Sequence, residues 1–583
     1  MFRNSKFHSL LRLSGYLKKH RLALCFVFLF AIISTVFSVL APYVTGQITT
    51  VLYQGVSSGH FDMHRIWQLV ALLVALYLSG TLFGYLQNFG MAKITAEVMY
   101  SLRQDIDRKM HRMTLDFYDT HTNGEVLSVI TNDVDMINGV LSDDLTDIVT
   151  QVITAVGILV MMIAISPWLA LIAVGMVALS LLSSRRVVKA SETYYARQQK
   201  ELGDLNGYIE EIYTGESIVQ LYNYQEHVQE RYKELNDALQ KSAQTADTAS
   251  GTIAPLTTLF TNLGYVLIAV IGCIRALQGQ MPVGSIQAML QYTRQFSQPF
   301  TDIAETASDF GSASAAADRI FGLLDMAEES PDPVPGKVPA QNDGTVDFSH
   351  VQFGYTKDKL LMHDVNLQVK SGQKIAIVGP TGAGKTTLVN LLMRFYEING
   401  GEIEVDGVNT KEMTRDELRR HFGMVLQDTW LFEGTVAENL AYSRDDLSEA
   451  QIEEAAEAAG ADSFIRQLPG GYKANLSENG DNLSQGQRQL LTIARAMASD
   501  PEIMILDEAT SNVDVFTEQT IQQAMAKLMK GRTSFVIAHR LATIKDADLI
   551  LYMENGDIKE TGTHEQLMKK NGKYAALYNS QFA

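Results

Sequence analysis

Long stretches without a charged residue limit what this chain of 583 residues can fold into. Four of them cover residues 22–61, 66–92, 148–184 and 248–274. A helix needs about 20 apolar residues to cross the hydrocarbon core of a bilayer, and each stretch reaches that length. The third is long enough for two crossings joined by a tight turn at Ser166 and Pro167. The chain is therefore expected to be embedded in a lipid bilayer.

A further apolar stretch covers residues 281–300 and is the most polar of the set, because it contains QYTRQFSQPF. Six membrane helices are therefore predicted, near residues 22–44, 66–92, 148–165, 168–184, 252–274 and 281–302. Arg294 lies in the sixth. A charge at membrane depth predicts a water-filled cavity or a carboxylate partner. The alternative is that the helix has already left the hydrocarbon, or that the side chain reaches the interface.

The distribution of Lys and Arg predicts the orientation. Both residue types are frequent before residue 22 and in the loops 93–147 and 185–247, whereas the opposite loops hold only Arg65 and Arg275. Positive loops face the cytoplasm, so both termini are expected there, in a multi-pass protein of the cytoplasmic membrane. The first apolar run is too long for a cleavable signal peptide. The two long loops are predicted to extend the membrane helices and to turn near residues 122–124 and 214–215, although ordinary loop turns explain these breaks equally well.

Composition excludes several classes of protein. The net charge of −18 argues against a nucleic-acid-binding protein with a basic surface. Cys25 and Cys273 both lie in apolar runs, so no disulfide framework or Cys/His metal site is predicted, and both are expected to be packing residues.

The character of the chain changes after the last apolar stretch. The segment MAEESPDPVPGKVPAQNDG holds four of the twelve Pro residues, which is typical of a linker. Short apolar strands then alternate with helical patterns to the end of the chain, which indicates a soluble α/β domain. The predicted organisation is a membrane domain at residues 1–322, a linker at 323–344 and an α/β domain at 345–583.

The segment GPTGAGKTT predicts a phosphate-binding loop, because it follows the apolar strand KIAIV and opens a helical pattern. Glycines let backbone N–H groups close around phosphates, and the helix N-terminus adds partial positive charge. Lys385 is expected to reach the β- and γ-phosphates of ATP and the Thr386 hydroxyl to bind Mg²⁺. The predicted loop consists of Gly379, Pro380, Thr381, Gly382, Ala383, Gly384, Lys385, Thr386 and Thr387.

Two further strands end in residues suited to ATP hydrolysis. EIMILDEAT is an apolar strand followed by Asp507, predicted to contact Mg²⁺, and Glu508, predicted to orient or deprotonate the attacking water. SFVIAHR delivers His539 to the same edge of the sheet, where a contact to the γ-phosphate is predicted.

Together with LSQGQRQ between the phosphate loop and the Asp-Glu strand, these motifs resemble the ATP-binding cassette (ABC) transporter family. The order of membrane half and ATPase resembles the exporter type, and FYDTHTNGEVLSVITNDVDMI looks like the first cytoplasmic loop of that class. The resemblance covers nearly the whole chain. It implies six transmembrane helices with long cytoplasmic extensions, followed by an α/β P-loop NTPase domain.

The resemblance also implies roles for single residues. LSQGQ is similar to the family signature LSGGQ, so Ser484, Gly486 and Gln487 are expected to contact ATP held by a second cassette. Tyr355 would stack on adenine, or else pack at the strand edge. Gln427 would sense the γ-phosphate and the metal. In SNVD, Asp514 matches the acid of the D-loop. The segments 118–125 and 213–220 match the helices that carry motion to the membrane half.

Gln485 departs from the family pattern, since it replaces the second Gly of the signature. In heterodimeric bacterial multidrug exporters, the subunit that keeps the catalytic Glu often carries the altered signature, and this chain keeps Glu508. A heterodimer of half-transporters is therefore expected. A homodimer remains the alternative, because one side chain at a helix start seldom abolishes anion binding by backbone amides.

The expected function is ATP-driven export of apolar or amphipathic small molecules, of the multidrug type, by alternating access in a dimer. A lipid flippase and a peptide exporter use the same ATP-driven mechanism and remain alternatives. An ATP-gated channel or membrane-tethered sensor is disfavoured by Glu508, because a binding-only module needs no base.

Overall fold

The computed structural model of the chain describes residues 5–356, 359–427, 429–444, 446–507, 515–538 and 544–582. They form two compact units. The first, here the helical unit, comprises Met1–His111 and His121–Met326, and the second, the sheet unit, comprises Arg112–Thr120 and Ala327–Ala583. The sheet unit thus includes the short helix α4 (Leu115–Thr120), which comes from the first long loop between apolar stretches.

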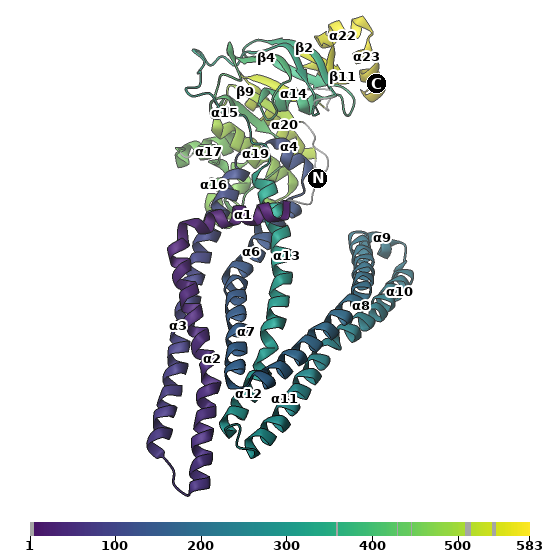
Figure 1. The fold of residues 1–583 in the computed structure, drawn as a ribbon. Helices are drawn as coiled ribbons and strands as arrows, with labels where there is room; N and C mark the ends of the chain where they lie inside the picture. The colour runs from purple at the N-terminus through teal and green to yellow at the C-terminus, as the bar shows by residue number, and fades with distance from the viewer. Residues whose placement is uncertain are drawn as a thin grey trace. The chain divides into compact units, whose positions relative to one another are not determined.

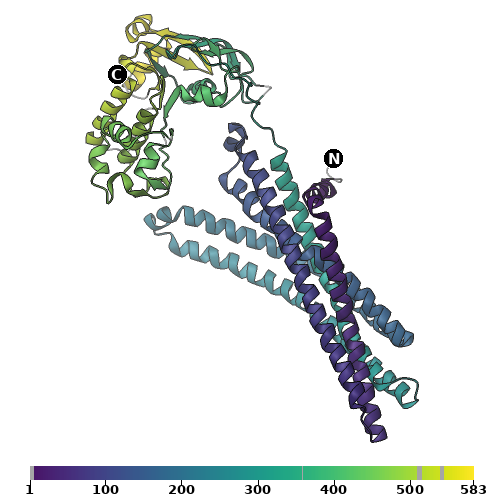
Figure 2. The ribbon, with the colours of Figure 1, turned by 90° about the vertical axis from the view of Figure 1, so that its left-hand side faces the viewer.

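The helical unit contains long helices that pair lengthwise. The pairs α2–α3 and α8–α10/α11 run side by side (Figures 1 and 2). Its helices are α1 (Ser5–Leu17), α2 (Arg21–Ser58), α3 (Met63–Met110), α5 (Asn123–Ser128), α6 (Val134–Gly139), α7 (Leu145–Ile165), α8 (Pro167–Thr214), α9 (Glu216–Leu221), α10 (Gln225–Gly251), α11 (Ile253–Leu277), α12 (Val283–Phe296) and α13 (Gln298–Leu324). A short 3₁₀ turn (Lys18–His20) and two π-helical turns (Val129–Asp133 and Val140–Asp144) complete it.

Five helical spans among the described residues are long and apolar enough to cross a membrane: Leu11–Ser58, Met63–Met110, Asn123–Ile165, Pro167–Thr214 and Gln225–Leu277. The predicted sixth span is divided at Ser297 between α12 and α13, and α12 has only 14 residues. Its polar side chains explain why it lacks a comparable apolar run. Helices α3 and α8 each have 48 residues, so they continue well past their apolar parts, as predicted.

Cys25 and Cys273 are free thiols, and both are exposed on the surface of the single chain. The prediction that they are packing residues inside the protein was therefore wrong. On a helix that lies in a membrane, an apolar side chain is stable against lipid and needs no protein neighbour.

Helices α2 and α12 approach each other at backbone distance. A Cβ atom on Gly46 would lie 2.4 Å from the carbonyl oxygen of Gly284, and one on Gly284 would lie 1.6 Å from that of Gly46. Small residues allow such contacts between membrane helices. The contact is extended by Thr50, whose hydroxyl accepts a hydrogen bond of 3.2 Å from the Gly284 N–H, and by Tyr292, whose hydroxyl donates to the Val39 carbonyl at 2.7 Å.

The sheet unit contains a six-stranded sheet, a four-stranded antiparallel sheet and a two-stranded ladder. The six-stranded sheet has the order β12-β11-β3-β10-β9-β6, in which only β12 is antiparallel to its neighbour. Its strands are β3 (Lys374–Val378), β6 (Phe422–Val425), β9 (Ile503–Asp507), β10 (Thr533–Ile537), β11 (Leu549–Glu554) and β12 (Asp557–Gly562). The four-stranded sheet consists of β2 (Met362–Val369), β1 (Val346–Phe353), β4 (Gly400–Val405) and β5 (Val408–Asn409), and the ladder of β7 (Gly434–Thr435) and β8 (Asn475–Leu476).

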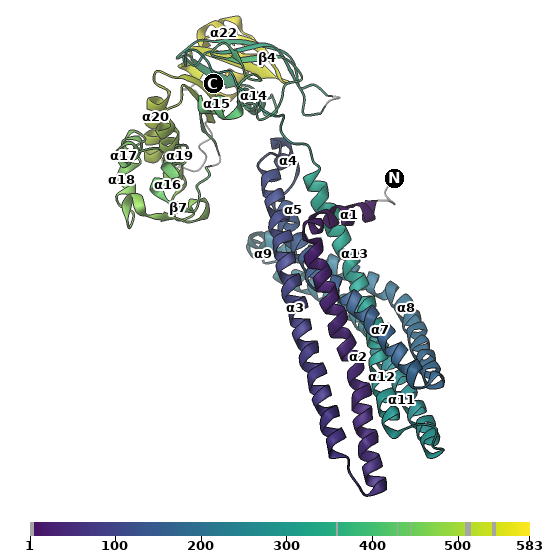
Figure 3. The same ribbon diagram turned by 60° about the vertical axis from the view of Figure 1, so that its left-hand side comes forward.

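Both faces of the six-stranded sheet are covered, as expected for parallel strands. Along β3, Ile375 and Ile377 belong to a core shared with the antiparallel sheet and α14, whereas Ala376 and Val378 belong to a core shared with α19 and α20. Figure 3 shows α16–α19 gathered apart from α14, α15 and α22. The helices are α14 (Lys385–Leu392), α15 (Arg415–Arg420), α16 (Val436–Leu440), α17 (Glu449–Ala458), α18 (Asp462–Ile465), α19 (Gln485–Ser499), α20 (Val515–Met529), α22 (His564–Lys570) and α23 (Lys573–Phe582).

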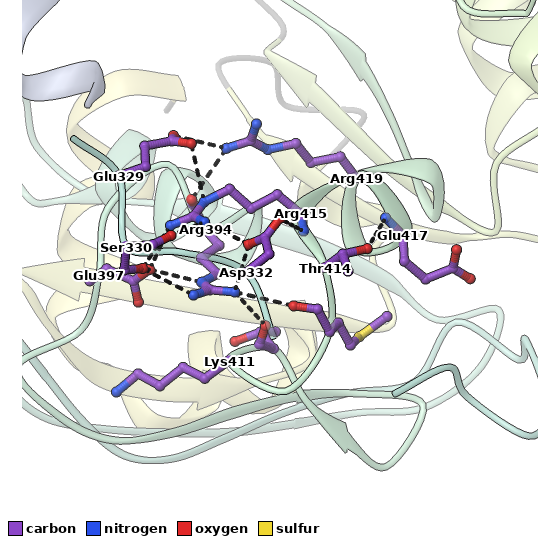
Figure 4. A network of polar contacts seen from close by, with 12 residues as sticks. Glu329, Ser330, Asp332, Arg394, Glu397, Lys411, Thr414, Arg415, Glu417 and Arg419 are labelled. Atoms are coloured by element: carbon purple, nitrogen blue, oxygen red, sulfur yellow. Dashed lines mark hydrogen bonds and ion pairs between the residues drawn. The ribbon is translucent and has the colours of Figure 1, made fainter. Parts of the chain in front are cut away.

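The Pro-rich segment after α13 is fixed to the sheet unit by a buried ion-pair network (Figure 4). The guanidinium of Arg415 donates to Asp332 at 2.6 Å and to Glu397 at 2.9 Å, and that of Arg394 donates to Glu397 at 2.9 Å. Both arginines are less than a tenth exposed. The hydroxyl of Ser330 donates to Glu397 at 2.7 Å. Side-chain charges therefore hold a segment that has no apolar periodicity of its own.

Candidate functional site

The predicted phosphate loop connects β3 to α14 and ends at a glycine in the left-handed region. Gly384 is the N-cap of α14 and has φ = +96°, which strongly favours glycine. A Cβ atom on Gly379 would lie 2.3 Å from the carbonyl oxygen of Met553, at the end of β11. The N–H of Gly556 donates to the Ala383 carbonyl at 3.0 Å. The loop thus packs against the end of β11 and the turn that follows it. A side chain at position 379 would not fit there.

Lys385, the first residue of α14, folds back over this loop. Its ammonium donates to the carbonyl oxygens of Gly379 at 2.8 Å and Pro380 at 3.1 Å. Burial lowers the pKa of Lys385, while the nearby Asp507 acts in the opposite direction. The ammonium is partly desolvated and lies beside the phosphate loop, so it is placed to bind phosphate oxygens.

The carboxyl ends of the central strands meet at this edge of the sheet. Asp507 at the end of β9 is in register with Ile537 of β10, which pairs with Ile377 one residue before the end of β3. In open α/β folds, ligands bind at this edge. The predicted residues Glu508, Asp514 and His539 lie outside the described residues. Of the acids and the histidine predicted for this edge, Asp507 is the one that lies in the described part of the chain.

Tyr355 follows β1 and lies beside the helix that the phosphate loop opens. Its hydroxyl oxygen is 2.8 Å from that of Thr387, and half of the residue is exposed. Thr386, one residue earlier, is exposed. Of the two adjacent threonines, Thr387 is thus turned toward the protein and Thr386 toward solvent.

Ser484 is the N-cap of α19 in a complete capping box. Its hydroxyl accepts from the Gln487 N–H at 3.3 Å, and the Gln487 side chain accepts from the Ser484 N–H at 2.9 Å. Gly486 is buried, whereas Ser484 and Gln485 are exposed. The Gln487 side chain is occupied in the cap. Ser484 and Gln485 are therefore accessible at the positive end of the α19 dipole.

The residues predicted to hold Mg²⁺ are Thr386, Gln427 and Asp507. Their donors are hydroxyl, amide and carboxylate oxygens, which this hard cation prefers. Gln427 is exposed in the loop after β6. No group of three or more His, Cys, Asp or Glu suited to a metal occurs in the described ranges. The oxygen donors therefore fit a cation that is held largely by nucleotide phosphates and water.

Sequence reasoning missed Tyr396, which links the site to α4. The Tyr396 ring meets that of Tyr355 edge-to-face with centroids 5.2 Å apart, and its hydroxyl donates to the carboxylate of Asp119. Burial, followed by this hydrogen bond, raises the pKa of Tyr396. The signal in the sequence was an aromatic pair, Phe395 and Tyr396, soon after the phosphate-loop helix. Its partner is 277 residues away, so no local pattern could reveal the contact.

The C-terminal helix also reaches the phosphate loop. A small cavity of about 130 Å³ is lined by loop residues 379–381 and by Tyr574 and Tyr578. Tyr574 is almost completely buried, and its hydroxyl lies 2.7 Å from Nδ1 of His564. Burial, with the nearby Tyr578, raises the pKa of Tyr574 to about 12. Residues of α23 and of the phosphate loop therefore line the same cavity.

The fold and this site define a membrane-embedded P-loop ATPase. Sequence-family models match both parts: "ABC transporter transmembrane region" at residues 24–300 and "ABC transporter" at residues 362–511. A Bacillus subtilis relative described as "Uncharacterized ABC transporter ATP-binding protein YfiC" is 40% identical over 98% of this chain and 94% of its own length. The chain belongs to the ABC transporter family.

Three further proteins are similar to this chain over most of its length. A Mycobacterium bovis protein described as "Fatty acid ABC transporter ATP-binding/permease protein" is 44% identical over 88% of this chain and 81% of its own. The B. subtilis "Probable multidrug resistance ABC transporter ATP-binding/permease protein YheH" is 32% identical over 88% and 76%. A solved structure of "a bacterial Atm1-family ABC exporter with ATP bound" has a TM-score of 0.74 and 27% identity, over 97% of this chain and 98% of that one.

The family assignment confirms the expected class. The chain is a multi-pass membrane protein of the exporter type, with a transmembrane region fused to an ATP-binding domain. Its ATPase is coupled to transport, and ABC exporters work as dimers in a membrane.

Proposed function

We propose that this chain exports apolar or amphipathic small molecules from the cytoplasm. The observation that carries the proposal is the phosphate loop, with Lys385 folded over Gly379 and Pro380, in the same chain as five membrane-length apolar spans. In the proposed mechanism, ATP binds the closed pair of cassettes better than the open pair. It thereby shifts the membrane helices from one access state to the other. Loss of the γ-phosphate then resets the cycle.

Each residue of the nucleotide site has a proposed role. Tyr355 stacks on adenine, the loop from Gly379 to Thr387 holds the phosphates, and Thr386, Gln427 and Asp507 hold Mg²⁺. The cation would neutralise charge on the transferred phosphoryl group. Glu508 orients the attacking water, with His539 and Gln427 near the γ-phosphate. Ser484, Gly486, Gln487 and Asp514 serve the site completed with the second chain.

Two exposed surfaces support a dimer. At the tip of the α8–α10 pair, Tyr213 and Leu221 are 85% and 69% exposed. In the sheet unit, Trp430 and Tyr442 leave another apolar surface uncovered. Exposed apolar patches on a folded chain mark interaction sites. A second half-transporter that covers both would also complete the two ATP sites. We place both termini and the sheet unit in the cytoplasm, because Lys and Arg are frequent in the loops on that side.

Glu508 together with Gln485 favours a heterodimer in which the partner supplies an intact signature. The capping box leaves Gln485 exposed at the start of α19, where it would face nucleotide bound by the partner. A homodimer is the second candidate, since the backbone of α19 keeps its helical start. A multidrug type of cargo is favoured by one relative named for multidrug resistance, and a fatty-acid cargo by two relatives named for fatty acid.

The test is the ATPase rate of this chain purified alone in lipid, with Glu508→Gln as the blank. A rate well above the blank supports a homodimer that tolerates Gln485. A rate equal to the blank, in protein that binds ATP, supports the heterodimer. A chain that binds no ATP would contradict the proposed function itself.

A further inference from the structure

A cavity of about 280 Å³ lies in the helical unit beside the contact between Gly46 and Gly284. Its size is close to the lower end of the range for small-molecule sites, about 300 Å³. Three helices line it: α2, the start of α3 and the start of α12. It is separate from the nucleotide site, and nothing in the proposed mechanism uses it.

The chemistry of its lining is polar and positive. Arg65 of α3 is the one charged residue that lines it, and none of the lining residues is Asp or Glu. Tyr43, Gln47 and Thr50 of α2 and Ser285 of α12 add hydroxyl and amide groups. The first turn of α12 forms one wall, so the positive end of that helix dipole has the same sign as Arg65.

The guanidinium of Arg65 forms no ion pair with any residue in the described ranges. The nearest acid in sequence, Asp62, is the N-cap of α3 and accepts a hydrogen bond of 3.0 Å from the Arg65 N–H. That bond fixes the backbone of Arg65 at the start of the helix and leaves its side chain free for another acceptor. Arg65 is exposed at the start of α3, so its guanidinium is accessible to an acceptor from outside the chain, and an anion is the partner that matches its charge.

Two apolar side chains follow Arg65 along the same face of α3. Leu69 lines the cavity four residues after Arg65, and Leu72 follows three residues later, so all three lie on one face of α3. Leu72 is 47% exposed, and Val51 adds an apolar lining from α2. Leu69 itself is buried, so the apolar surface becomes accessible at Leu72. A positive site beside this apolar surface matches an amphipathic molecule with an acidic head.

We propose that this cavity binds the acidic head group of an amphipathic cargo, with Arg65 as the residue that recognises it. The guanidinium forms two parallel charge-assisted hydrogen bonds to a carboxylate. The hydrocarbon chain of the ligand lies along Leu69 and Leu72. The inference rests on the proposed export function and narrows its cargo to acidic amphiphiles.

The experiment measures binding of radiolabelled oleate to the full chain, together with its partner subunit if one is needed, in lipid nanodiscs. Arg65→Gln is expected to weaken oleate binding by about tenfold or more, because the charge-assisted bonds are lost. Arg65→Lys keeps the charge but loses the paired N–H donors of the guanidinium. Its affinity for oleate is therefore expected to lie between those of the wild type and Arg65→Gln. The matched control is Arg275→Gln at the end of α11, whose side chain donates to Ser166 and does not line the cavity.

Competitors identify the head group. Oleyl phosphate is expected to displace oleate from the wild type, whereas oleyl alcohol, with the same chain and no charge, is expected to bind equally well to the wild type and to Arg65→Gln. Equal oleate binding by Arg65→Gln and the wild type would overturn the proposal. Displacement of oleate by inorganic phosphate at equal concentration would also overturn it, because the site would then recognise a free anion without a chain.

The ATPase rate of the same preparations separates this inference from the proposed function. Absence of a Glu508-dependent rate in all samples, with the partner subunit included, would contradict the export function, while the binding data would still test the cavity. A normal rate with oleate binding unchanged by Arg65→Gln would contradict the cavity site alone.

Discussion

The hydroxyl oxygen of Tyr355 lies 2.8 Å from that of Thr387, so the residue proposed to stack on adenine is joined to the helix that carries the phosphate loop. Tyr396 continues this link by packing edge-to-face on Tyr355 and donating to Asp119 of α4. The nucleotide site and a segment of the first long loop thus share one network within the sheet unit. A change in how Tyr355 is held can therefore reach α4 through a single side chain.

Tyr396→Phe removes one hydroxyl and keeps the ring. The KM for ATP is expected to change by less than about twofold, while stimulation of ATPase by transported cargo falls, because α4 loses its bond to the site. The control is Tyr472→Phe, which removes a similar hydrogen bond of 2.7 Å from a tyrosine hydroxyl to Asp462, the first residue of α18. Equal stimulation in Tyr396→Phe and the wild type would contradict the link.

Tyr355→Ala removes the proposed adenine platform. Stacking of a base on an aromatic side chain contributes about 1–3 kcal/mol, so the KM for ATP is expected to rise by about tenfold or more. Tyr355→Phe keeps the ring and loses only the hydroxyl near Thr387, so its KM should stay close to that of the wild type. A Tyr355→Phe variant as weak as Tyr355→Ala would show that the hydroxyl, and not stacking, is what matters.

Lys385→Met removes the cation that is folded over the phosphate loop. ATPase activity is expected to fall by at least about 100-fold, because a preorganised charge beside the phosphates is lost. Lys374→Met, at the other end of the same strand, is the matched control and should keep its activity. Retained activity in Lys385→Met would contradict the assignment of this loop.

Acid is expected to weaken the ion-pair network around Glu397. Burial alone would raise the pKa of Glu397, but hydrogen bonds from Ser330 and the charges of Arg394 and Arg415 outweigh it and lower the pKa. The carboxylate therefore stabilises the fold above its unfolded pKa of about 4.3, and this contribution is lost as the pH falls through the lower folded value.

Arg415→Gln should lower the free energy of unfolding of the sheet unit at pH 7 by about 2 kcal/mol or more and reduce its loss of stability in acid. Fluorescence of Trp430, in a background of Trp67→Phe and Trp168→Phe, reports this unit alone. Arg466→Gln, which breaks exposed ion pairs to Glu453 and Asp462, should lower the free energy of unfolding much less than Arg415→Gln does, because solvent screens these pairs. A larger effect at Arg466 than at Arg415 would refute this ranking.

Gly284→Ala places a methyl group against the backbone of α2 and should destabilise the helical unit. A Cβ atom there would lie 1.6 Å from the Gly46 carbonyl oxygen, so the helices must separate. The thermal unfolding midpoint in detergent is expected to fall by several degrees, which corresponds to a loss of about 1–3 kcal/mol. Gly80→Ala, whose Cβ would meet nothing closer than 3.8 Å, should leave the midpoint nearly unchanged.

The features that could be predicted from the sequence are those set by residues close together in the chain. The phosphate loop depends on Gly384 at a helix start, and Ser484 caps a helix three residues before its own partner Gln487, so both are visible in short segments. The apolar spans were also visible, because the bilayer imposes their length.

Contacts between distant segments were not predictable in this way. Asp119 and Tyr396 are brought together only by the fold. Likewise, Gln47, Arg65 and Ser285 line one cavity although they belong to three different helices. The exposed Cys25 and Cys273 show a second limit. An apolar residue in a membrane segment has two stable environments, protein and lipid, and its sequence neighbours do not distinguish them.

The most direct test of the account is ATP-driven uptake of a lipophilic dye into inside-out vesicles that contain this chain and, if required, its partner. The account predicts uptake against the dye gradient with the wild type and none with Glu508→Gln, although both bind ATP. Dye movement that continues with Glu508→Gln, or that only follows the gradient, would contradict an ATP-driven exporter and indicate a nucleotide-gated channel.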